Sequence, residues 1–282
     1  MNTLTQRILL TVIGIPVFFS SIFFFPQAHY LFFTIICIGF SILGSYEINR
    51  IIKSSVGENT LLHPIITGIA PFSMYLQLYV FTEFQVTFII YMAILLYLLA
   101  KEIFIGDKDN FQKSILRMAT SFFQLIYPSF FVIFVIYLTS FAHADSLIIY
   151  WFLMIFSNDV FAYVFGMLLG KGSRGFLPVS PNKSLVGFAG GFCITLLNGY
   201  IFYTLVTPLQ EIAPLWVFLI LSACISIFAN LGDLVESAMK RSSDKKDSGK
   251  IIPGRGGVLD TIDSIIFSAP IFILFLIYIL KV

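Results

Sequence analysis

The residues best suited to chemistry lie near the end of a long apolar run, where acidic, hydroxyl and basic side chains occur close together. Asp233, Ser237 and Lys240 are spaced i, i+4 and i+7, so a helix would place them on one side. A solvated helix end would scatter such residues around its circumference. The same segment also contains Asn230, Glu236 and Arg241. This 230–241 segment is therefore a candidate site for phosphate and metal chemistry.

A second group is the loop over residues 244–263, which reads D-K-K-D-S-G-K-I-I-P-G-R-G-G-V-L-D-T-I-D. Its glycines predict a tight turn directly before the last apolar run, and backbone N–H groups at such a turn suit phosphate oxygens. Asp260 and Asp263 lie one helical turn apart at the start of that run. The flanking charges make the turn more specific than glycines alone: Lys246, Asp247, Lys250 and Arg255.

A third candidate is Asp159, an acidic residue inside an apolar stretch. A charge at the bilayer centre costs roughly 2.5–3.5 kcal/mol on insertion scales, so it tends to persist with a partner or a task. Tyr163 follows at i+4, and Gly166 and Gly170 continue the face with small residues. Small residues permit close helix approach, so a packing seam with one paired aspartate is an alternative interpretation.

Oxygen ligands near Lys and Arg are typical of Mg²⁺-assisted phosphoryl or nucleotidyl transfer. Mg²⁺ typically binds one or two carboxylates and completes its octahedron with water and substrate phosphates. The sequence offers no Ser-His-Asp, Cys-His or P-loop arrangement for another reaction. The cysteines and histidines stand singly, which excludes a disulfide framework or a zinc pattern: Cys37, Cys193, Cys224, His29, His63 and His143.

The elements that position these residues must be membrane helices. The chain has 282 residues, of which 58% are hydrophobic and 11% are charged, and its mean hydropathy is +0.94. A soluble domain is about 25% charged, so most of this surface must face lipid. The 33 Phe residues suit acyl chains. A net charge of +2 gives no indication of a nucleic-acid partner.

The predicted fold is an all-α polytopic membrane protein with about nine spanning helices, since a span takes about 20 apolar residues. The chain is interpreted as one integral membrane domain over 1–282. Within it, 1–145 would form N-terminal packing or dimer helices, and 146–282 would carry catalysis. The predicted spans lie near 8–25, 29–45, 64–81, 85–100, 118–141, 147–170, 185–207, 213–232 and 262–280.

Lysine and arginine positions predict the orientation, because such residues collect on the cytoplasmic side. With a cytoplasmic N-terminus, 16 of the 17 Lys and Arg residues fall inside, and Lys281 falls outside with the C-terminus. The outer connections are short and nearly uncharged. The candidate chemistry is therefore predicted at the cytoplasmic face.

These motifs resemble those of the phosphatidate cytidylyltransferase (CDP-diacylglycerol synthase) family. The resemblance covers residues 150–263 by motif and the whole chain by length and helix count. The segment 237–263 is similar to the family signature over some 27 positions with fixed gaps. Upstream, the run 232–237, the Asp-x-x-Ala-Tyr helix beginning at Asp159 and the loop 180–184 also resemble the family pattern.

Four positions depart from that pattern. The family usually has His at Arg255, Arg at Thr261, Lys at Asn182 and Glu at Val186. Arg255 partly restores the charge lost at Thr261, and the expected metal-ligand acids remain. The sequence therefore predicts a working but divergent enzyme.

The resemblance implies that CTP and phosphatidic acid react to give CDP-diacylglycerol and pyrophosphate. It implies catalytic roles for Asp233, Asp260 and Lys240, with Asp233 and Asp260 sharing Mg²⁺ and a second, monovalent cation such as K⁺ nearby. It also implies a homodimer in a bacterial inner membrane. The substrate-binding residues it implies are Lys183, Ser237, Arg241, Lys246, Asp247, Gly256, Gly257, Asp159, Tyr163, Ser180, Arg255 and Asp263.

Two other function classes compete with this interpretation. One is a related CTP-using lipid enzyme: the Lys-Arg-x4-Lys-Asp run argues against a polyprenol or dolichol kinase, whereas a CDP-archaeol synthase would differ only in its lipid. The other is an ion-coupled transporter using Asp159 and Asp233. A transporter of that kind predicts inverted halves and broken helices at matching places, and the sequence shows neither.

Overall fold

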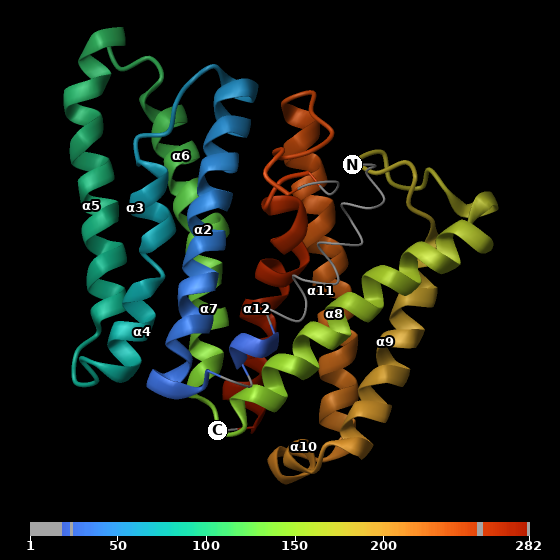
Figure 1. Cartoon of the computed structure of the whole chain (residues 1–282). Helices are drawn as coiled ribbons and strands as arrows, with labels where there is room; N and C mark the ends of the chain where they lie inside the picture. The colour runs from blue at the N-terminus through green and yellow to red at the C-terminus, as the bar shows by residue number, and fades with distance from the viewer. Residues whose placement is uncertain (1–18, 23–24, 253–255, 281–282) are drawn as a thin grey trace. The chain divides into compact units, whose positions relative to one another are not determined.

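The computed structural model describes residues 19–22, 25–252 and 256–280. Within these ranges the regular elements are helices, and paired extended backbone is limited to two isolated bridges, Arg174 with Ser184 and Ile252 with Gly256. The protein is therefore all-α, as its sequence predicts (Figure 1).

Seven described helices are long and apolar enough to span a membrane. The protein is thus a polytopic membrane protein, which confirms the predicted class. The seven are α2 (Gln27–Val56), α5 with η1 (Val86–Asp109), α6 through η3 (Ser114–Ser140), α8 (Ala144–Leu168), α9 (Leu185–Leu205), α11 (Leu215–Ser242) and the Leu259–Tyr278 part of α12 (Leu259–Leu280).

The predicted span 64–81 is divided into two short helices, α3 (Pro64–Ile69) and α4 (Phe72–Tyr79). Pro71 lies at the division, and a proline has no N–H to continue the helical hydrogen-bond ladder. The predicted span 8–25 falls mostly outside the described residues. The total of nine spans and the orientation of the termini stay predictions.

Two helices extend past their predicted ends, and the added turns include polar residues. α2 runs beyond residue 45 to Val56 and ends at Gly57, whose φ of 77° gives the left-handed cap that glycine favours. α11 runs beyond residue 232 to Ser242. Glu47 is therefore a helical residue rather than a loop residue, and Asp233 lies on a helix, as its spacing with Ser237 and Lys240 predicts.

The chain divides into two compact units. Unit 1 comprises residues 1–140 and 242–262, and unit 2 comprises residues 141–241 and 263–282. The loop that precedes α12, residues 244–258, which we call the glycine-rich loop, thus belongs to unit 1 together with α2. The predicted division of the chain near residue 145 stays a prediction.

In unit 1, α2 packs against α3, α4, α6 (Ser114–Gln124) and α7 (Phe131–Tyr137) (Figure 1). Buried Leu61, Leu62, Leu98 and Leu125 form an apolar cluster there. Arg117, 5% exposed, forms ion pairs with Glu102 at 2.5 Å and with Asp109 at 2.6 Å. A buried arginine with two acids keeps its charge compensated.

In unit 2, α8 packs along α9 (Figure 1), and aromatic side chains fill the core. The rings of Trp151 and Phe272 stack at 5.8 Å, and Tyr150 meets Phe218 edge-on at 5.2 Å. The buried Trp151 Nε1–H donates to Ser268 Oγ at 3.1 Å. This core fixes α8, α11 and the unit 2 part of α12 against one another.

Candidate active site

Three carboxylates of unit 2 converge: Asp233 and Glu236 on α11 and Asp263 on α12. One oxygen from each lies within 4.8 Å of the others. Glu236 and Asp263 are buried, and Asp233 is partly exposed. We call these three residues the acidic cluster.

A glycine permits this convergence. A Cβ on Gly232 would lie 2.6 Å from the carbonyl oxygen of Asp263 and 2.7 Å from Cβ of Phe267. Any side chain at this position would force α11 and α12 apart, so the acidic cluster depends on a residue without one.

Two lysines accompany the acidic cluster. Lys183 forms an ion pair with Asp233, and Lys240 forms one with Glu236, four residues before it on α11. Ser237 Oγ donates to Asp233 Oδ1 at 3.4 Å. The structure therefore brings Asp233, Ser237 and Lys240 to one site, as their spacing predicts, and adds Lys183 from a distant loop.

The loop before α9 positions Lys183. The backbone N–H of Lys183 donates to the Ser180 carbonyl at 3.1 Å, which closes a tight turn. Ser184 then caps α9 by accepting the Gly187 N–H at 3.0 Å. Arg241 reaches the same loop, where its Nε donates to the Val179 carbonyl at 3.5 Å. Ser180 thus acts here through its backbone.

The face of α8 that contains Asp159 supports both interpretations of its sequence. Asp263 lies within electrostatic reach of Asp159 as well as of Asp233, and Asp159 Oδ1 accepts a hydrogen bond from Asn158 Nδ2 at 3.3 Å. Gly166 lies against Ser184, where a Cβ would be 3.1 Å from the hydroxyl oxygen. A packing seam and an aspartate near the acidic cluster thus occur together.

Tyr163 differs from Asp159 in its environment, because it is 69% exposed. Its predicted part in shaping a substrate cavity stays a prediction.

The glycine-rich loop of unit 1 is folded around Asp260. Its Oδ2 accepts hydrogen bonds from Ser248 N at 2.9 Å, Ser248 Oγ at 2.8 Å and Gly257 N at 2.7 Å. Gly256 has a φ of +113°, which only glycine adopts readily. Gly256 and Ile252 exchange backbone hydrogen bonds at 2.9 and 3.1 Å. These hydrogen bonds join the described segments on either side of residues 253–255, and Asp260 Oδ2 is a shared acceptor between them.

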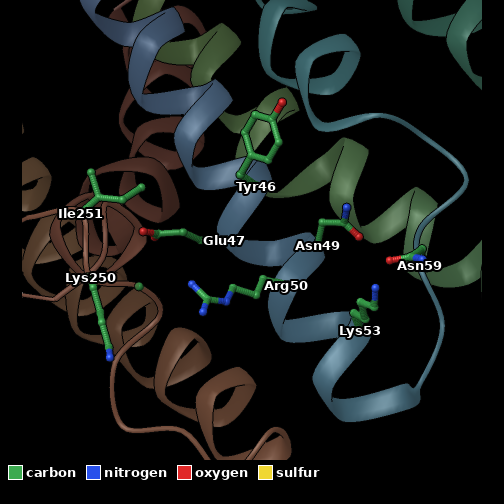
Figure 2. A pocket seen from close by; sticks show the side chains of 9 residues that line it. Tyr46, Glu47, Asn49, Arg50, Lys53, Asn59, Lys250 and Ile251 are labelled. Atoms are coloured by element: carbon green, nitrogen blue, oxygen red, sulfur yellow. The ribbon is translucent and has the colours of Figure 1, made fainter.

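Glu47 contacts this loop from α2, and the sequence did not indicate its role. It lies on α2, is 3% exposed, and points toward the loop (Figure 2). Its carboxylate accepts from Val258 N at 3.0 Å and Leu259 N at 2.8 Å, and it lies 2.9 Å from Ser248 Oγ, whose single hydrogen is shared between Glu47 and Asp260. The available signal was an acidic residue directly after an apolar run, which the predicted end of α2 at residue 45 placed in a loop.

Other predicted residues of this loop are less constrained. Lys246 and Asp247 are exposed. Arg255 lies outside the described residues, as do Pro253 and Gly254. Their predicted roles stay predictions.

The acidic cluster has the donor chemistry that Mg²⁺ prefers. Two oxygens bound to one Mg²⁺ can be at most about 4.2 Å apart, because each bond is about 2.1 Å. One oxygen from each residue of the acidic cluster lies within 4.8 Å of the others, which is close to this limit. Asp233 belongs to unit 2 and Asp260 to unit 1. Their sharing of one cation stays a prediction.

Comparisons with known proteins agree with this chemistry. Residues 5–279 match the profile described as the Cytidylyltransferase family. The phosphatidate cytidylyltransferase of Staphylococcus saprophyticus is 42% identical over 132 residues, 47% of this chain and 49% of that protein. The Bacillus subtilis phosphatidate cytidylyltransferase is 48% identical over 124 residues, 44% of each chain.

The phosphatidate cytidylyltransferase of Staphylococcus aureus strain COL is 39% identical over 130 residues, 44% of this chain and 46% of that protein. The chain thus spans about half the length of the curated relatives it matches. The family profile, in contrast, extends over nearly the whole chain. This protein therefore belongs to the cytidylyltransferase family.

Proposed function

We propose that this protein transfers the cytidylyl group of CTP to phosphatidic acid, giving CDP-diacylglycerol and pyrophosphate. The observation that carries the proposal is the convergence of Asp233, Glu236 and Asp263 beside Lys183 and Lys240, in a chain of the cytidylyltransferase family. The proposed substrates are those in the name of the relatives, phosphatidate cytidylyltransferase. The three acids outnumber the two lysines, so the site favours a cation.

The reaction exchanges one phosphoanhydride bond for another. An oxygen of the phosphatidic acid phosphate forms a bond to the α-phosphorus of CTP. The bond from that phosphorus to the oxygen bridging to the β-phosphate breaks, and pyrophosphate takes the electron pair. A phosphate oxygen is already a competent nucleophile, so positioning and charge neutralisation provide the catalysis.

Mg²⁺, when bound, supplies neutralisation of the polyphosphate charge. Asp233 and Asp260 are the proposed ligands, and Glu236 and Asp263 provide carboxylates beside Asp233. A second, monovalent cation such as K⁺ is also part of the proposal.

Lys183 and Lys240 form ion pairs with acids in this structure. When a cation binds these acids, both lysines become available for substrate phosphates, because ammonium groups donate readily to phosphate oxygens. Arg241 and Lys246 are the further proposed phosphate ligands. The proposal also includes a homodimer in the bacterial inner membrane with its active site facing the cytoplasm.

The test is an assay of the purified full-length protein with labelled CTP, phosphatidic acid and Mg²⁺. Labelled CDP-diacylglycerol should form, and a chelator should stop its formation until Mg²⁺ is restored. Asp233→Asn and Asp260→Asn should each abolish labelling without changing the elution volume or the thermal midpoint greatly. Normal turnover in both variants would refute the metal assignment, and no labelled lipid with the unaltered protein would refute the function.

A further inference from the structure

A cavity of about 370 Å³ in unit 1 has a charge pattern that the proposed reaction does not explain. It lies between the C-terminal part of α2 and loop residues 249–251 (Figure 2). Its polar walls come from both segments and from the chain after α2: Tyr46, Asn49, Arg50, Lys53, Asn59 and Lys250. Pockets for small ligands begin at about 300 Å³, so the volume accommodates a phosphate with part of its parent molecule.

Three cations line this cavity, and no ion pair joins them to an acid within the described ranges. Arg50 and Lys53 are one turn apart on α2, and Lys250 belongs to the loop (Figure 2); all three side chains are exposed. A fourth cation is close, because Lys245 Nζ donates to the Arg50 carbonyl at 3.4 Å. Like charges that line one cavity repel, so an anion bound there would reduce that repulsion.

The acidic side chains Glu47 and Glu58 near the cavity already have partners outside it. Glu47 lines the cavity, but its two oxygens accept hydrogen bonds from Ser248, Val258 and Leu259. Glu58, which follows α2, forms an ion pair with Lys113 at 2.6 Å. The three lining cations therefore exceed the single lining acid by two charges.

Neutral donors complete the cavity. The Oδ1 of Asn49 accepts from Thr60 N at 3.4 Å and from Thr60 Oγ1 at 3.1 Å. Because a backbone N–H can only donate, this contact assigns the oxygen of the amide and leaves Nδ2 as a donor. Asn59 and Tyr46 add an amide and a hydroxyl to the walls.

A simpler explanation accounts for one of the cations. Lys53 lies in the last turn of α2, where a positive charge stabilises the negative end of the helix dipole. The same effect does not account for Lys250, which lies on another segment. Cations from two segments that line one cavity are the feature that favours a bound anion.

We propose that this cavity binds a phosphate group, held by Arg50, Lys53 and Lys250. A guanidinium presents paired donors that match phosphate oxygens, and lysines add charge. The apolar part of α2 is a candidate membrane span, so the phosphate has two possible sources, a lipid headgroup or a soluble polyphosphate. The site is inferred from unit 1 alone and does not rest on the proposed activity.

The test compares the double variant Arg50→Gln/Lys53→Gln with Lys108→Gln, which removes an exposed lysine on η1 (Asp107–Asp109) away from the cavity. The full-length protein without divalent cations is titrated with inorganic pyrophosphate for the soluble source. Phosphatidic acid bound per protein is counted by native mass spectrometry for the lipid source. The double variant should lose about tenfold or more in affinity for at least one probe, equivalent to about 1.4 kcal/mol.

Each outcome decides the proposal. If the double variant loses affinity for pyrophosphate alone, the ligand is a soluble polyphosphate. If it loses affinity for phosphatidic acid alone, the ligand is a lipid headgroup. If it loses affinity for both, the site accepts a phosphate from either source. Equal binding of both probes by the double variant and Lys108→Gln overturns the proposal. If the double variant does not fold, the exposed Lys250→Gln replaces it in the same comparison.

The same preparations separate this inference from the proposed function. If the unaltered protein makes no CDP-diacylglycerol but loses phosphate affinity in the variant, the reaction is wrong and the cavity assignment stands. If the protein makes CDP-diacylglycerol and the variant binds both probes normally, the cavity assignment is wrong and the reaction stands.

Discussion

Glu47 accepts a hydrogen bond from the backbone N–H of Leu259, the first residue of α12, at 2.8 Å. A carboxylate at the N-terminus of a helix satisfies N–H groups that have no partner within the helix, and it interacts favourably with the helix dipole. Glu47 also contacts Ser248, whose hydroxyl lies 2.8 Å from Asp260 Oδ2. The position of a predicted metal ligand thus depends on a residue of α2.

Glu47→Gln should therefore weaken both the loop and the reaction. The amide nitrogen of glutamine cannot accept, so at least one of the three donors to Glu47 loses its partner, which is costly in a buried site. We expect a lower thermal midpoint and about a tenfold or larger loss of kcat/KM, the usual range for residues that orient metal ligands.

The matched control for Glu47→Gln is Glu83→Gln, which neutralises an exposed acid in the connection before α5. Thermal unfolding and lipid labelling are measured on both. A Glu47→Gln protein that behaves like Glu83→Gln in both assays would show that Asp260 is positioned without help from α2.

Lys183→Gln tests the ion pair with Asp233. The variant removes a cation from the acidic cluster, so we expect poorer binding of substrate phosphates, with kcat/KM lower by about tenfold or more. Lys113→Gln is the control, because it also breaks a lysine–acid pair but at an exposed position. Exposed pairs contribute about 0–1 kcal/mol, so Lys113→Gln should retain activity. Equal kinetics for the two variants would exclude Lys183 from substrate binding.

Gly232→Ala tests the close approach that forms the acidic cluster. The added methyl group would lie 2.6 Å from the Asp263 carbonyl oxygen, and such overpacking costs about 1–3 kcal/mol. We expect reduced stability together with reduced activity. Gly172→Ala is the matched control, because a Cβ there meets nothing within 4 Å. Unchanged melting and turnover in Gly232→Ala would contradict the tight contact.

Arg117→Gln tests a network of unit 1 that contains none of the proposed catalytic residues. Arg117 donates to Glu102 from Nε at 3.1 Å and to Asp109 from Nη1 at 2.6 Å. Removing the cation leaves a buried acid without compensation, so the thermal midpoint should fall by several degrees. Arg117→Lys keeps the charge but loses the forked geometry of the guanidinium, so its thermal midpoint should fall by less. Turnover per folded molecule should stay close to normal, and an inactive folded variant would give this network a catalytic role.

The fold class could be predicted from the sequence because it depends on composition and local periodicity. Lipid excludes charged side chains and requires backbone hydrogen bonds within the helix, so apolar runs of sufficient length identify the spans. The same local geometry predicted that Ser237 lies beside Asp233, because residues four apart on a helix are neighbours. The division of the 64–81 segment was missed because hydropathy does not register Pro71.

The composition of the site depended on tertiary structure. The contact of Lys183 with Asp233 joins positions 50 residues apart, and that of Glu47 with Ser248 joins positions 201 apart. No local spacing specifies such pairs, because they arise only when helices pack and buried polar groups must find partners. The sequence alone indicated which polar residues are candidates for the chemistry. Only packing decided which acids surround Asp233 and which helix supports Asp260.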